Sequence, residues 1–176
     1  MQQEIAALFR RLTSGAYVVG VAHGGRRNAF TAAWIMQVSF DPLLLALAIH
    51  PEHASYPLLV ESGAFAVSVL ERGRLDLARD FGTRSGRGVD KLAGVRWRAA
   101  RSGAPVLEES VAFFDCRVVS RHPAGDHEIV VGRVVDGGLL RPDATPMLYV
   151  ETGDLDGSEE LYPNVMSRGA EERKSR

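Results

Sequence analysis

Short apolar runs, many of them rich in β-branched residues, recur along the chain and are separated by residues that favour turns. Runs of about 4–8 such residues predict β-strands, in which successive side chains point to opposite faces. The predicted strands cover residues 16–22, 28–40, 43–49, 64–70, 112–121, 128–137 and 146–150. The run 43–49 is apolar at every position, so we expect it to be buried on both faces.

Apolar residues at helical spacing predict a few short helices between these strands. One opens the chain within residues 5–12, a second ends at Gly63, and a third covers residues 74–81. The segment 82–104 is rich in glycine and arginine, and we expect a long loop with little regular structure there. A loop of that length inside a compact domain is usually functional or mobile.

The order of these elements predicts a mainly β fold with peripheral helices. Consecutive strands have short links, which favours antiparallel pairing over parallel βαβ units. Six or seven antiparallel strands are enough to close a small barrel. We expect residues 1–165 to form one domain, and the charged segment 166–176, which lacks apolar periodicity, to be a flexible tail.

Composition narrows the function classes. The chain has 176 residues, 45% of them hydrophobic, which suits one domain with a real core. With 21 basic and 22 acidic residues the net charge is −1, so nothing favours nucleic acid or an anionic membrane. The longest apolar run, 43–49, is far shorter than the ~20 residues of a membrane-spanning helix. With no signal-peptide pattern at the N-terminus, we expect a soluble cytoplasmic protein.

The usual catalytic signatures are absent from the sequence. There is no phosphate-binding glycine loop, no H-E-x-x-H and no G-x-S-x-G. The single cysteine, Cys116, lies within a predicted strand, where a buried inert thiol is expected more than a nucleophile. His50 and His53 could ligate a metal, but Pro51 lies between them and no third ligand is evident, so no metal is expected.

The strand Asn-Ala-Phe-Thr-Ala-Ala-Trp-Ile-Met-Gln-Val-Ser-Phe, residues 28–40, ends at Asp41-Pro42 and has two unlike faces. Its apolar face, which suits a core, carries Phe30, Ala32, Trp34, Met36, Val38 and Phe40. Its other face carries Thr31, Ala33, Ile35, Gln37 and Ser39. This second face either faces solvent on an edge strand or makes close contact with a flat polar ligand.

His127 follows a predicted hairpin loop, residues 122–126, and stands at the start of a strand. Such a position can project an imidazole into a cleft, although an exposed loop histidine fits the sequence equally well.

Five segments, in this order, resemble the flavin reductase-like family: Leu-Thr-Ser-Gly-Ala-Tyr-Val-Val-Gly-Val-Ala, the strand just described, residues 43–70, residues 77–92 and Gly-Asp-His-Glu-Ile-Val-Val-Gly-Arg-Val-Val-Asp. The resemblance covers roughly residues 5–150. It implies an FMN-binding split barrel, that is, an antiparallel six- to seven-stranded split β-barrel, assembled as a homodimer. FMN or FAD would lie near the subunit interface, with NADH or NADPH as electron donor.

The resemblance also implies roles for individual residues. The segment from residue 29 to residue 34 would line the flavin ring with small side chains and backbone amides. Its residues are Ala29, Phe30, Thr31, Ala32, Ala33 and Trp34. The ribityl chain or pyrimidine edge would contact Gln37, Val38 and Ser39. The ribityl-phosphate end would contact Ala48, Ile49, His50, Ser55 and Tyr56. A hydroxyl such as that of Ser55 at a helix start suits a phosphate.

Further implied contacts lie downstream. Phe81, Arg84 and Ser85 match a segment that closes over the phosphate or the partner subunit's flavin, and Lys91 is an additional candidate. His127 matches a histidine near the flavin and the nicotinamide, and it would position them without acting as a nucleophile. The chain departs from the family pattern at Leu43, where a second proline is frequent.

The activity implied is hydride transfer from the C4 of a nicotinamide to flavin N5, which needs no protein nucleophile. Reduced flavin would then pass to a partner monooxygenase or to another acceptor. Two other hypotheses remain open: a flavoredoxin-like electron carrier that holds FMN and has little NAD(P)H activity, and a split barrel that has lost flavin. Tight or exchangeable flavin and NAD(P)H oxidation would distinguish the three.

Overall fold

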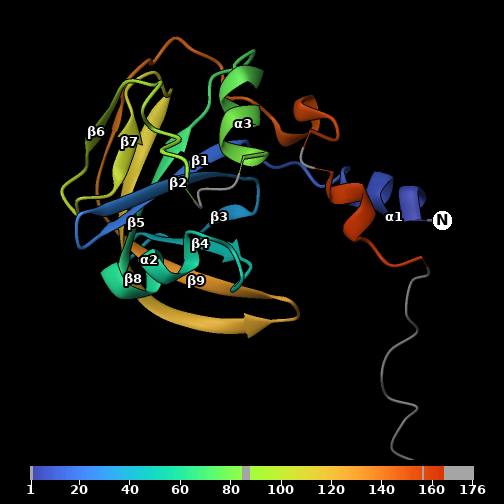
Figure 1. Ribbon diagram of the computed structural model, residues 1–176, viewed down its shortest axis with the longest axis horizontal. Helices are drawn as coiled ribbons and strands as arrows, with labels where there is room; N and C mark the ends of the chain where they lie inside the picture. Colours follow the sequence, from blue (N-terminus) through green and yellow to red (C-terminus); the bar gives the residue numbers. More distant parts are fainter. Residues whose placement is uncertain (1, 85–87, 156, 165–176) are drawn as a thin grey trace, which may run out of the picture.

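The computed structural model describes residues 2–84, 88–155 and 157–164. Nine strands and a few short helices follow one another along the chain (Figure 1). The helices are α1 (Gln2–Phe9), α2 (Tyr56–Ser62), α3 (Leu75–Gly82), η1 (Tyr149–Thr152) and η2 (Ser158–Leu161). The strands are β1 (Tyr17–His23), β2 (Arg26–Ala32), β3 (Ile35–Ser39), β4 (Leu44–Ile49), β5 (Ala64–Val69), β6 (Trp97–Ala99), β7 (Pro105–Leu107), β8 (Ala112–Ala124) and β9 (His127–Leu139).

Seven of the strands form one antiparallel sheet in the order β2-β1-β5-β8-β9-β4-β3. The other two, β6 and β7, form a small antiparallel hairpin of their own. The sheet curves around an apolar interior that also receives buried side chains of α2, whereas α3 packs on the outside. Figure 1 shows the curved sheet. The mainly β, antiparallel fold predicted from the sequence is confirmed. Within the described ranges, no helix is long and apolar enough to cross a bilayer.

The segment 28–40 is two strands instead of one. It breaks at Ala33 and Trp34, so that β2 pairs with β1 while β3 pairs with β4 at the opposite end of the sheet. Alternation across such a break does not continue. The predicted apolar core face is therefore wrong beyond the break, where Trp34, Met36 and Phe40 are 54%, 65% and 85% exposed.

The strand predicted to be buried on both faces alternates instead. In β4 the side chains of Leu45, Leu47 and Ile49 are buried, whereas those between them are only half-buried. Its neighbours β9 and β3 complete one wall of the barrel, so β4 has one face toward the interior and one toward the outside. A continuous apolar run thus does not distinguish a strand buried on two faces from one buried on a single face.

Two other predicted elements also differ. The segment 82–104 is not all loop, because β6 forms near its end and pairs with β7. Residues 146–150 make isolated bridges, Glu71 to Pro146 and Gly15 to Leu148, and then enter the 3₁₀ helix η1. The backbone pairing of this segment is therefore too short to form a strand.

The core is built from two main apolar clusters. The barrel interior holds buried side chains from β1, β4, β5 and β9, including Val19, Leu47, Phe65 and Val130. A second cluster packs α3 against the outside of β1 and β2, with Phe81 at its centre. Each large apolar side chain buried in this way stabilises the fold by about 1.5–3 kcal/mol.

The two ends of the described chain pack against each other beside the barrel. Phe9 of α1 stacks on Tyr162 with ring centroids 5.5 Å apart, and Arg10 pairs with Asp154 at 2.9 Å and Glu159 at 2.5 Å. We call α1 together with residues 149–155 and 157–162 the terminal arm. It projects to one side of the barrel (Figure 1) and is joined to it through Ser14, whose carbonyl accepts the N–H of Tyr149 at 2.8 Å.

Candidate functional site

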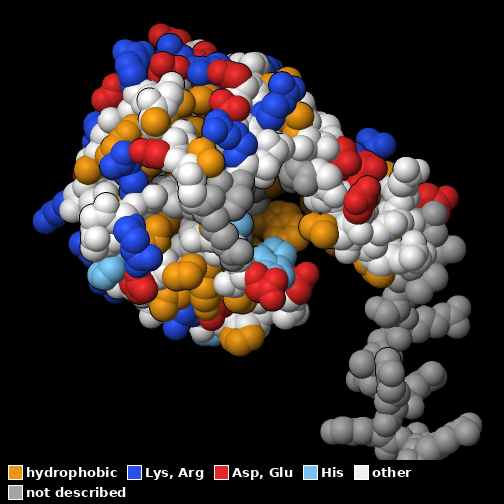
Figure 2. All heavy atoms as spheres, viewed as in Figure 1, with side chains coloured by type: hydrophobic (Ala, Val, Ile, Leu, Met, Phe, Trp, Pro, Cys, Tyr) orange, Lys and Arg blue, Asp and Glu red, His pale blue; other side chains and the backbone are white. Residues whose placement is uncertain are grey.

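A cavity of about 270 Å³ lies between the barrel and the terminal arm. Figure 2 shows it as a hollow in which apolar and histidine side chains gather. Its walls come from the break between β2 and β3, the end of β4, the tip of the β8–β9 hairpin, the end of α3 and the terminal arm. Five segments far apart in the sequence therefore meet at one place.

One wall of the cavity consists of small side chains. Ala32, Ala33, Ala48 and Gly82 line it, so backbone atoms can approach a bound molecule closely. Thr31 is fixed beside them, because its hydroxyl donates to the carbonyl of Ala78 in α3 at 2.8 Å. Such a wall accepts a flat ring system without displacing any side chain.

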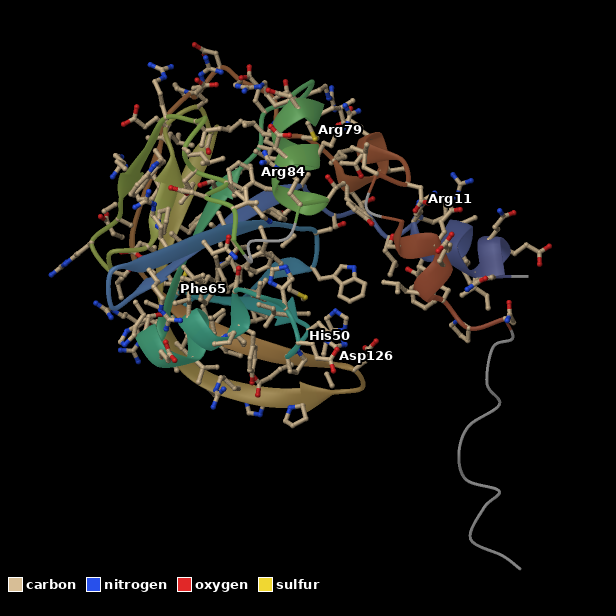
Figure 3. The ribbon with its side chains drawn as sticks, viewed as in Figure 1. Arg11, His50, Phe65, Arg79, Arg84 and Asp126 are labelled. Carbon is tan, nitrogen blue, oxygen red and sulfur yellow. The ribbon has the colours of Figure 1, made fainter. Side chains whose placement is uncertain are left out.

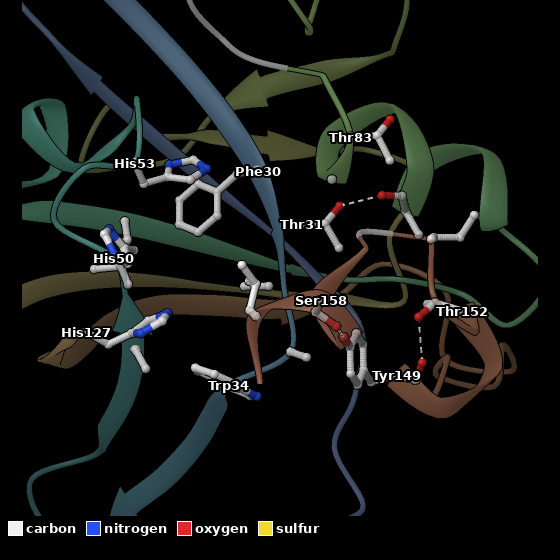
Figure 4. A pocket seen from close by; sticks show the side chains of 18 of the residues that line it. Phe30, Thr31, Trp34, His50, His53, Thr83, His127, Tyr149, Thr152 and Ser158 are labelled. Atoms are coloured by element: carbon white, nitrogen blue, oxygen red, sulfur yellow. Dashed lines mark hydrogen bonds between the residues drawn. The ribbon is translucent and has the colours of Figure 1, made fainter. Parts of the chain in front are cut away.

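Aromatic and imidazole rings form the adjoining wall (Figure 4). The centroid of the His127 ring lies 4.8 Å from that of Trp34 and 5.4 Å from that of His50. Deeper in, the rings of Phe30 and His53 are tilted against each other at 4.5 Å. These contacts give the cavity flat apolar faces with polar edges, which suits an aromatic heterocycle.

His127 enters the cavity from the tip of the β8–β9 hairpin. The strands extend to Ala124 and resume at His127, so Gly125 and Asp126 alone form the turn. Gly125 has φ +67°, a left-handed conformation that favours glycine. His50 and Asp126 lie close together at this end of the barrel (Figure 3).

The carboxylate of Asp126 is the partner of the His127 ring. Nδ1 of His127 lies 2.8 Å from Oδ1 of Asp126. This hydrogen bond, together with the charge of the imidazole when it is protonated, lowers the pKa of the Asp126 carboxyl. The carboxylate therefore stays ionised, and it fixes the orientation of the ring whose other nitrogen, Nε2, is left for a ligand.

The C-terminal end of α3 forms the far edge of the cavity and is contacted by a buried lysine from the segment that follows the helix. Nζ of Lys91 donates to the carbonyl of Phe81 at 2.9 Å, next to Gly82 and Thr83, which line the cavity. Burial, with a smaller effect from the positive charge of Arg84, lowers the pKa of Lys91 to about 8. The Lys91 ammonium thus stabilises the last turn of α3.

The structure brings half of the predicted site residues together. Nine of them line the cavity: Phe30, Thr31, Ala32, Ala33, Trp34, Ala48, Ile49, His50 and His127. Ala29 is buried behind them in the second core cluster. Their assignment to a flavin stays a prediction.

The three residues predicted from β3 lie elsewhere. Gln37 and Ser39 line a separate apolar groove of about 360 Å³, together with Met36 and Tyr17. Val38 is 45% exposed and lines neither hollow. The break before β3 explains this, because it carries these residues to the opposite edge of the sheet from β2.

The predicted phosphate-end residues are also dispersed in this chain. Ser55 is fully buried and accepts a hydrogen bond from Nδ2 of Asn28 at 3.0 Å. Tyr56 donates its hydroxyl to Glu128 at 2.9 Å. Phe81 is buried in the second core cluster.

Two further predicted residues belong to this region. Arg84 follows α3 and is labelled beside that helix in Figure 3. Ser85 lies outside the described residues.

The sequence did not indicate several residues that line the cavity. His53, Ala78, Gly82 and Thr83 come from segments near predicted site residues, and of these only His53 had a signal, the H-x-x-H pair. The terminal arm supplies the rest, Tyr149, Thr152, Leu155, Ser158, Leu161 and Tyr162. Tyr149 lies within the last predicted strand, and the other five follow it without periodicity, so no pattern pointed to a role for them in the site. Figure 4 shows Tyr149, Thr152 and Ser158 facing the histidines across the cavity.

Nucleophilic and metal chemistry find little support. Cys116 is buried in the barrel, and burial raises the pKa of its thiol to about 12. In the part of the chain that the structure describes, no group of three or more His, Cys, Asp or Glu side chains could hold a metal ion. What the cavity offers is a surface whose shape and lining suit contact with flat rings.

These features define a small antiparallel barrel with an open, ring-binding cavity at one edge. The chain matches the flavin reductase like domain over residues 9–156. It therefore belongs to the flavin reductase-like family, and the resemblance seen in the sequence is confirmed.

Individual relatives carry related names. FMN reductase (NADH) RutF 1 of Methylorubrum extorquens is 35% identical over 83% of this chain and 74% of its own length. Diflavin flavoproteins of Nostoc and Synechocystis match at 28–35% identity, and the chain spans about a quarter of their length.

Solved structures of the same fold agree. The NADH:FAD oxidoreductase SgcE6 of Streptomyces globisporus superposes with a TM-score of 0.77 at 31% identity, over 82% of this chain and 86% of that chain. A second structure of SgcE6 was obtained in complex with NAD and FAD fragments. A nitrilotriacetate monooxygenase component B homologue of Mycobacterium thermoresistibile matches with a TM-score of 0.76 at 28% identity, over 84% and 81% of the chains.

Proposed function

We propose that this protein is an NAD(P)H-dependent flavin reductase that transfers a hydride from a nicotinamide to FMN or FAD. The observation that carries the proposal is the cavity itself, in which a wall of alanine and glycine meets the rings of Trp34, His50 and His127. When bound there, a flavin would supply the hydride acceptor. The protein has to hold two flat rings together and exclude water.

Each wall has its own part in this proposal. Ala32, Ala33 and Ala48 would lie against the flavin ring, because their small side chains permit face-on contact. Trp34 and His127 would flank the space for the nicotinamide. With the N–H of Nδ1 donated to Asp126, Nε2 of His127 would accept a hydrogen bond from a polar group at the edge of either ring.

The open shape of the cavity supports a reductase over an electron carrier. A cavity of about 270 Å³ that opens to solvent leaves room for exchange of flavin, which a protein that supplies reduced flavin needs. The product would pass to a flavin-dependent monooxygenase or another acceptor. Similarity to a protein named as a monooxygenase component B supports the first of these.

A homodimer is part of the proposal. Large apolar side chains are exposed next to one another on β3 and its flanks, where Trp34, Met36, Val38, Phe40 and Leu43 are each 45% exposed or more. Clusters of this kind mark interaction surfaces in soluble proteins. A second copy that covers this surface would also lie beside the groove that Gln37 and Ser39 line, and those two residues remain candidates for contact with flavin.

Aerobic oxidation of NADH and NADPH, with FMN and FAD each added, tests the proposal. A flavin reductase gives oxidation that depends on both protein and added flavin. A yellow protein that retains flavin through dialysis and oxidises neither nicotinamide would instead be an electron carrier. A colourless protein that fails to quench FMN fluorescence would show that the site does not bind flavin.

A further inference from the structure

A small hydrogen-bonded network joins the β8–β9 hairpin to helix α2, on the face of β9 that also carries the buried Val130. The hydroxyl of Tyr56, the first residue of α2, donates to Oε2 of Glu128 at 2.9 Å. Nη1 of Arg121 in β8 donates to the same hydroxyl at 3.3 Å and lies 3.5 Å from Oε2 of Glu128. The side chain of Glu128 is only 14% exposed, so the contact is partly protected from water.

Glu128 is the neighbour of His127 in β9, and side chains alternate along a strand. The imidazole of His127 points into the cavity, where it meets Trp34 and His50. The carboxylate of Glu128 therefore points away from the cavity, toward α2, where Tyr56 receives it. The network therefore fixes β9 at Glu128, the residue next to His127, on the face opposite to the imidazole.

The hairpin needs such a tether because its tip extends beyond the sheet. β4 ends at Ile49, which pairs with Glu128, so beyond that point His127 is paired with Ala124 across the hairpin. Figure 1 shows the hairpin extending past β4. A two-stranded ribbon is marginally stable by itself in water. The position of His127 over the cavity consequently depends on the contacts that hold Glu128, the last residue of β9 that pairs with β4.

The other anchors at the tip are weaker. Asp126 belongs to the same turn as His127 and is itself largely exposed, so it orients the ring without fixing the hairpin. Helix α2, in contrast, is held to the barrel core by its buried residues Leu58 and Leu59. Tyr56 thus links the end of the hairpin to a helix that is packed into the core.

We infer that Tyr56 and Glu128 are positioning residues that hold the hairpin tip so that His127 lies against Trp34 and His50 in the cavity. This inference rests on the proposed function for its kinetic consequence. It gives Tyr56 a role other than the cofactor contact that family resemblance implies. Arg121 supports both groups, because its Nη1 donates to the hydroxyl of Tyr56 and lies 3.5 Å from Oε2 of Glu128.

The test compares Tyr56→Phe and Glu128→Gln with the wild type. Tyr56→Phe removes the hydroxyl and keeps the ring, and Glu128→Gln keeps the size and removes the charge. Each should raise the KM for the nicotinamide about threefold to tenfold, while the affinity for FMN, measured by fluorescence quenching, stays within about twofold. Ser120→Ala is the matched control, because it removes a hydroxyl on the same hairpin that pairs with His122 at 2.9 Å, away from Tyr56 and Glu128, and it should leave both constants unchanged.

A double-mutant cycle separates positioning from general loss of stability. If Tyr56 acts through His127, Tyr56→Phe should have no further effect on KM in a His127→Ala background. Additive effects would overturn the inference, as would a Tyr56→Phe variant that loses FMN affinity and keeps its KM.

The tether can also be tested apart from the enzyme activity. The NMR signals of the His127 ring report its contact with Trp34 through ring-current shifts, and they should move in Tyr56→Phe but not in Ser120→Ala. Unchanged signals would overturn the tether even in an active enzyme. If the wild type oxidises no nicotinamide but these signals move, the proposed function fails and the positioning role stands.

Discussion

At the scale of single residues, the site is defined by the shape of its walls and not by reactive groups. Alanine and glycine form one wall, and Trp34, His50 and His127 form the next. Hydride transfer between two rings needs close stacking and exclusion of water, and it needs no nucleophile. The absence of catalytic motifs from the sequence is therefore consistent with the activity we propose.

His127→Ala should mainly weaken the binding of the nicotinamide substrate. Loss of the ring removes a flanking surface next to Trp34 and one hydrogen-bond acceptor, so we expect the KM for NADH or NADPH to rise about tenfold with little change in FMN affinity. Steady-state kinetics and FMN fluorescence quenching measure the two effects. His122→Ala, an exposed histidine of the same hairpin, is the control. An effect confined to FMN affinity would assign His127 to the flavin alone.

Lys91 should make stability depend on pH. Its pKa is lowered to about 8 in the folded protein from an ordinary value of 10.5, mainly by burial. Between these two values the unfolded chain binds more protons than the folded one, so this residue makes the free energy of unfolding rise as pH increases. Below pH 8 that contribution is absent. Urea unfolding at pH 8 and pH 10 should show the rise in wild type relative to Lys91→Met, and parallel changes in both proteins would contradict it.

At the scale of elements, the sequence predicted most strands but not how the sheet is ordered. Alternation and turn residues located β1, β5, β8 and β9 closely. The sequence did not predict the break at Ala33 and Trp34, because neither residue interrupts the apolar pattern of the strand. The cavity wall itself follows from β2 and β4, but the terminal arm joins the site through tertiary packing that no local pattern encodes.

One close approach between elements gives a direct test of the packing. A Cβ added at Gly20 in β1 would lie 2.0 Å from the carbonyl oxygen of Pro105 in β7, so Gly20→Ala forces the backbones apart. We expect it to lower the free energy of unfolding by about 1–3 kcal/mol. Gly94→Ala, where an added Cβ meets nothing within 4 Å, should change it by about 0.5 kcal/mol or less. Equal midpoints of thermal unfolding for the two variants would contradict this packing.

At the scale of the whole molecule, two surfaces define how the protein would work. The terminal arm closes one side of the cavity, held to α1 by the ring of Phe9 and the ion pairs of Arg10. The exposed apolar side chains of β3 lie on the other side of the break that carries Trp34. A second copy packed there would place the cavity near the subunit interface, as the family resemblance implies.

One charged substitution in the exposed apolar surface of β3 tests whether the protein forms the proposed dimer. Met36 is 65% exposed in the middle of the apolar surface, so Met36→Asp should bury an unpaired carboxylate in a dimer and shift the protein to monomers. Sedimentation velocity of wild type and variant measures the change. Val89→Asp places the same charge at another exposed apolar position and should leave the dimer intact. A monomeric wild type at micromolar concentration would contradict the proposed assembly.

The most direct test of the account is reduction of FMN by NADH or NADPH without oxygen, followed as loss of the flavin's visible absorbance. The wild type should reduce added FMN rapidly. Ala33→Leu, which fills the small-residue wall, should slow the reaction at non-saturating FMN about tenfold or more, which corresponds to about 1.4 kcal/mol. Ala99→Leu, an exposed alanine on β6, should match the wild type. No reduction by the wild type with either nicotinamide, or equal rates for wild type and Ala33→Leu, would contradict the assignment of this cavity as the site of hydride transfer.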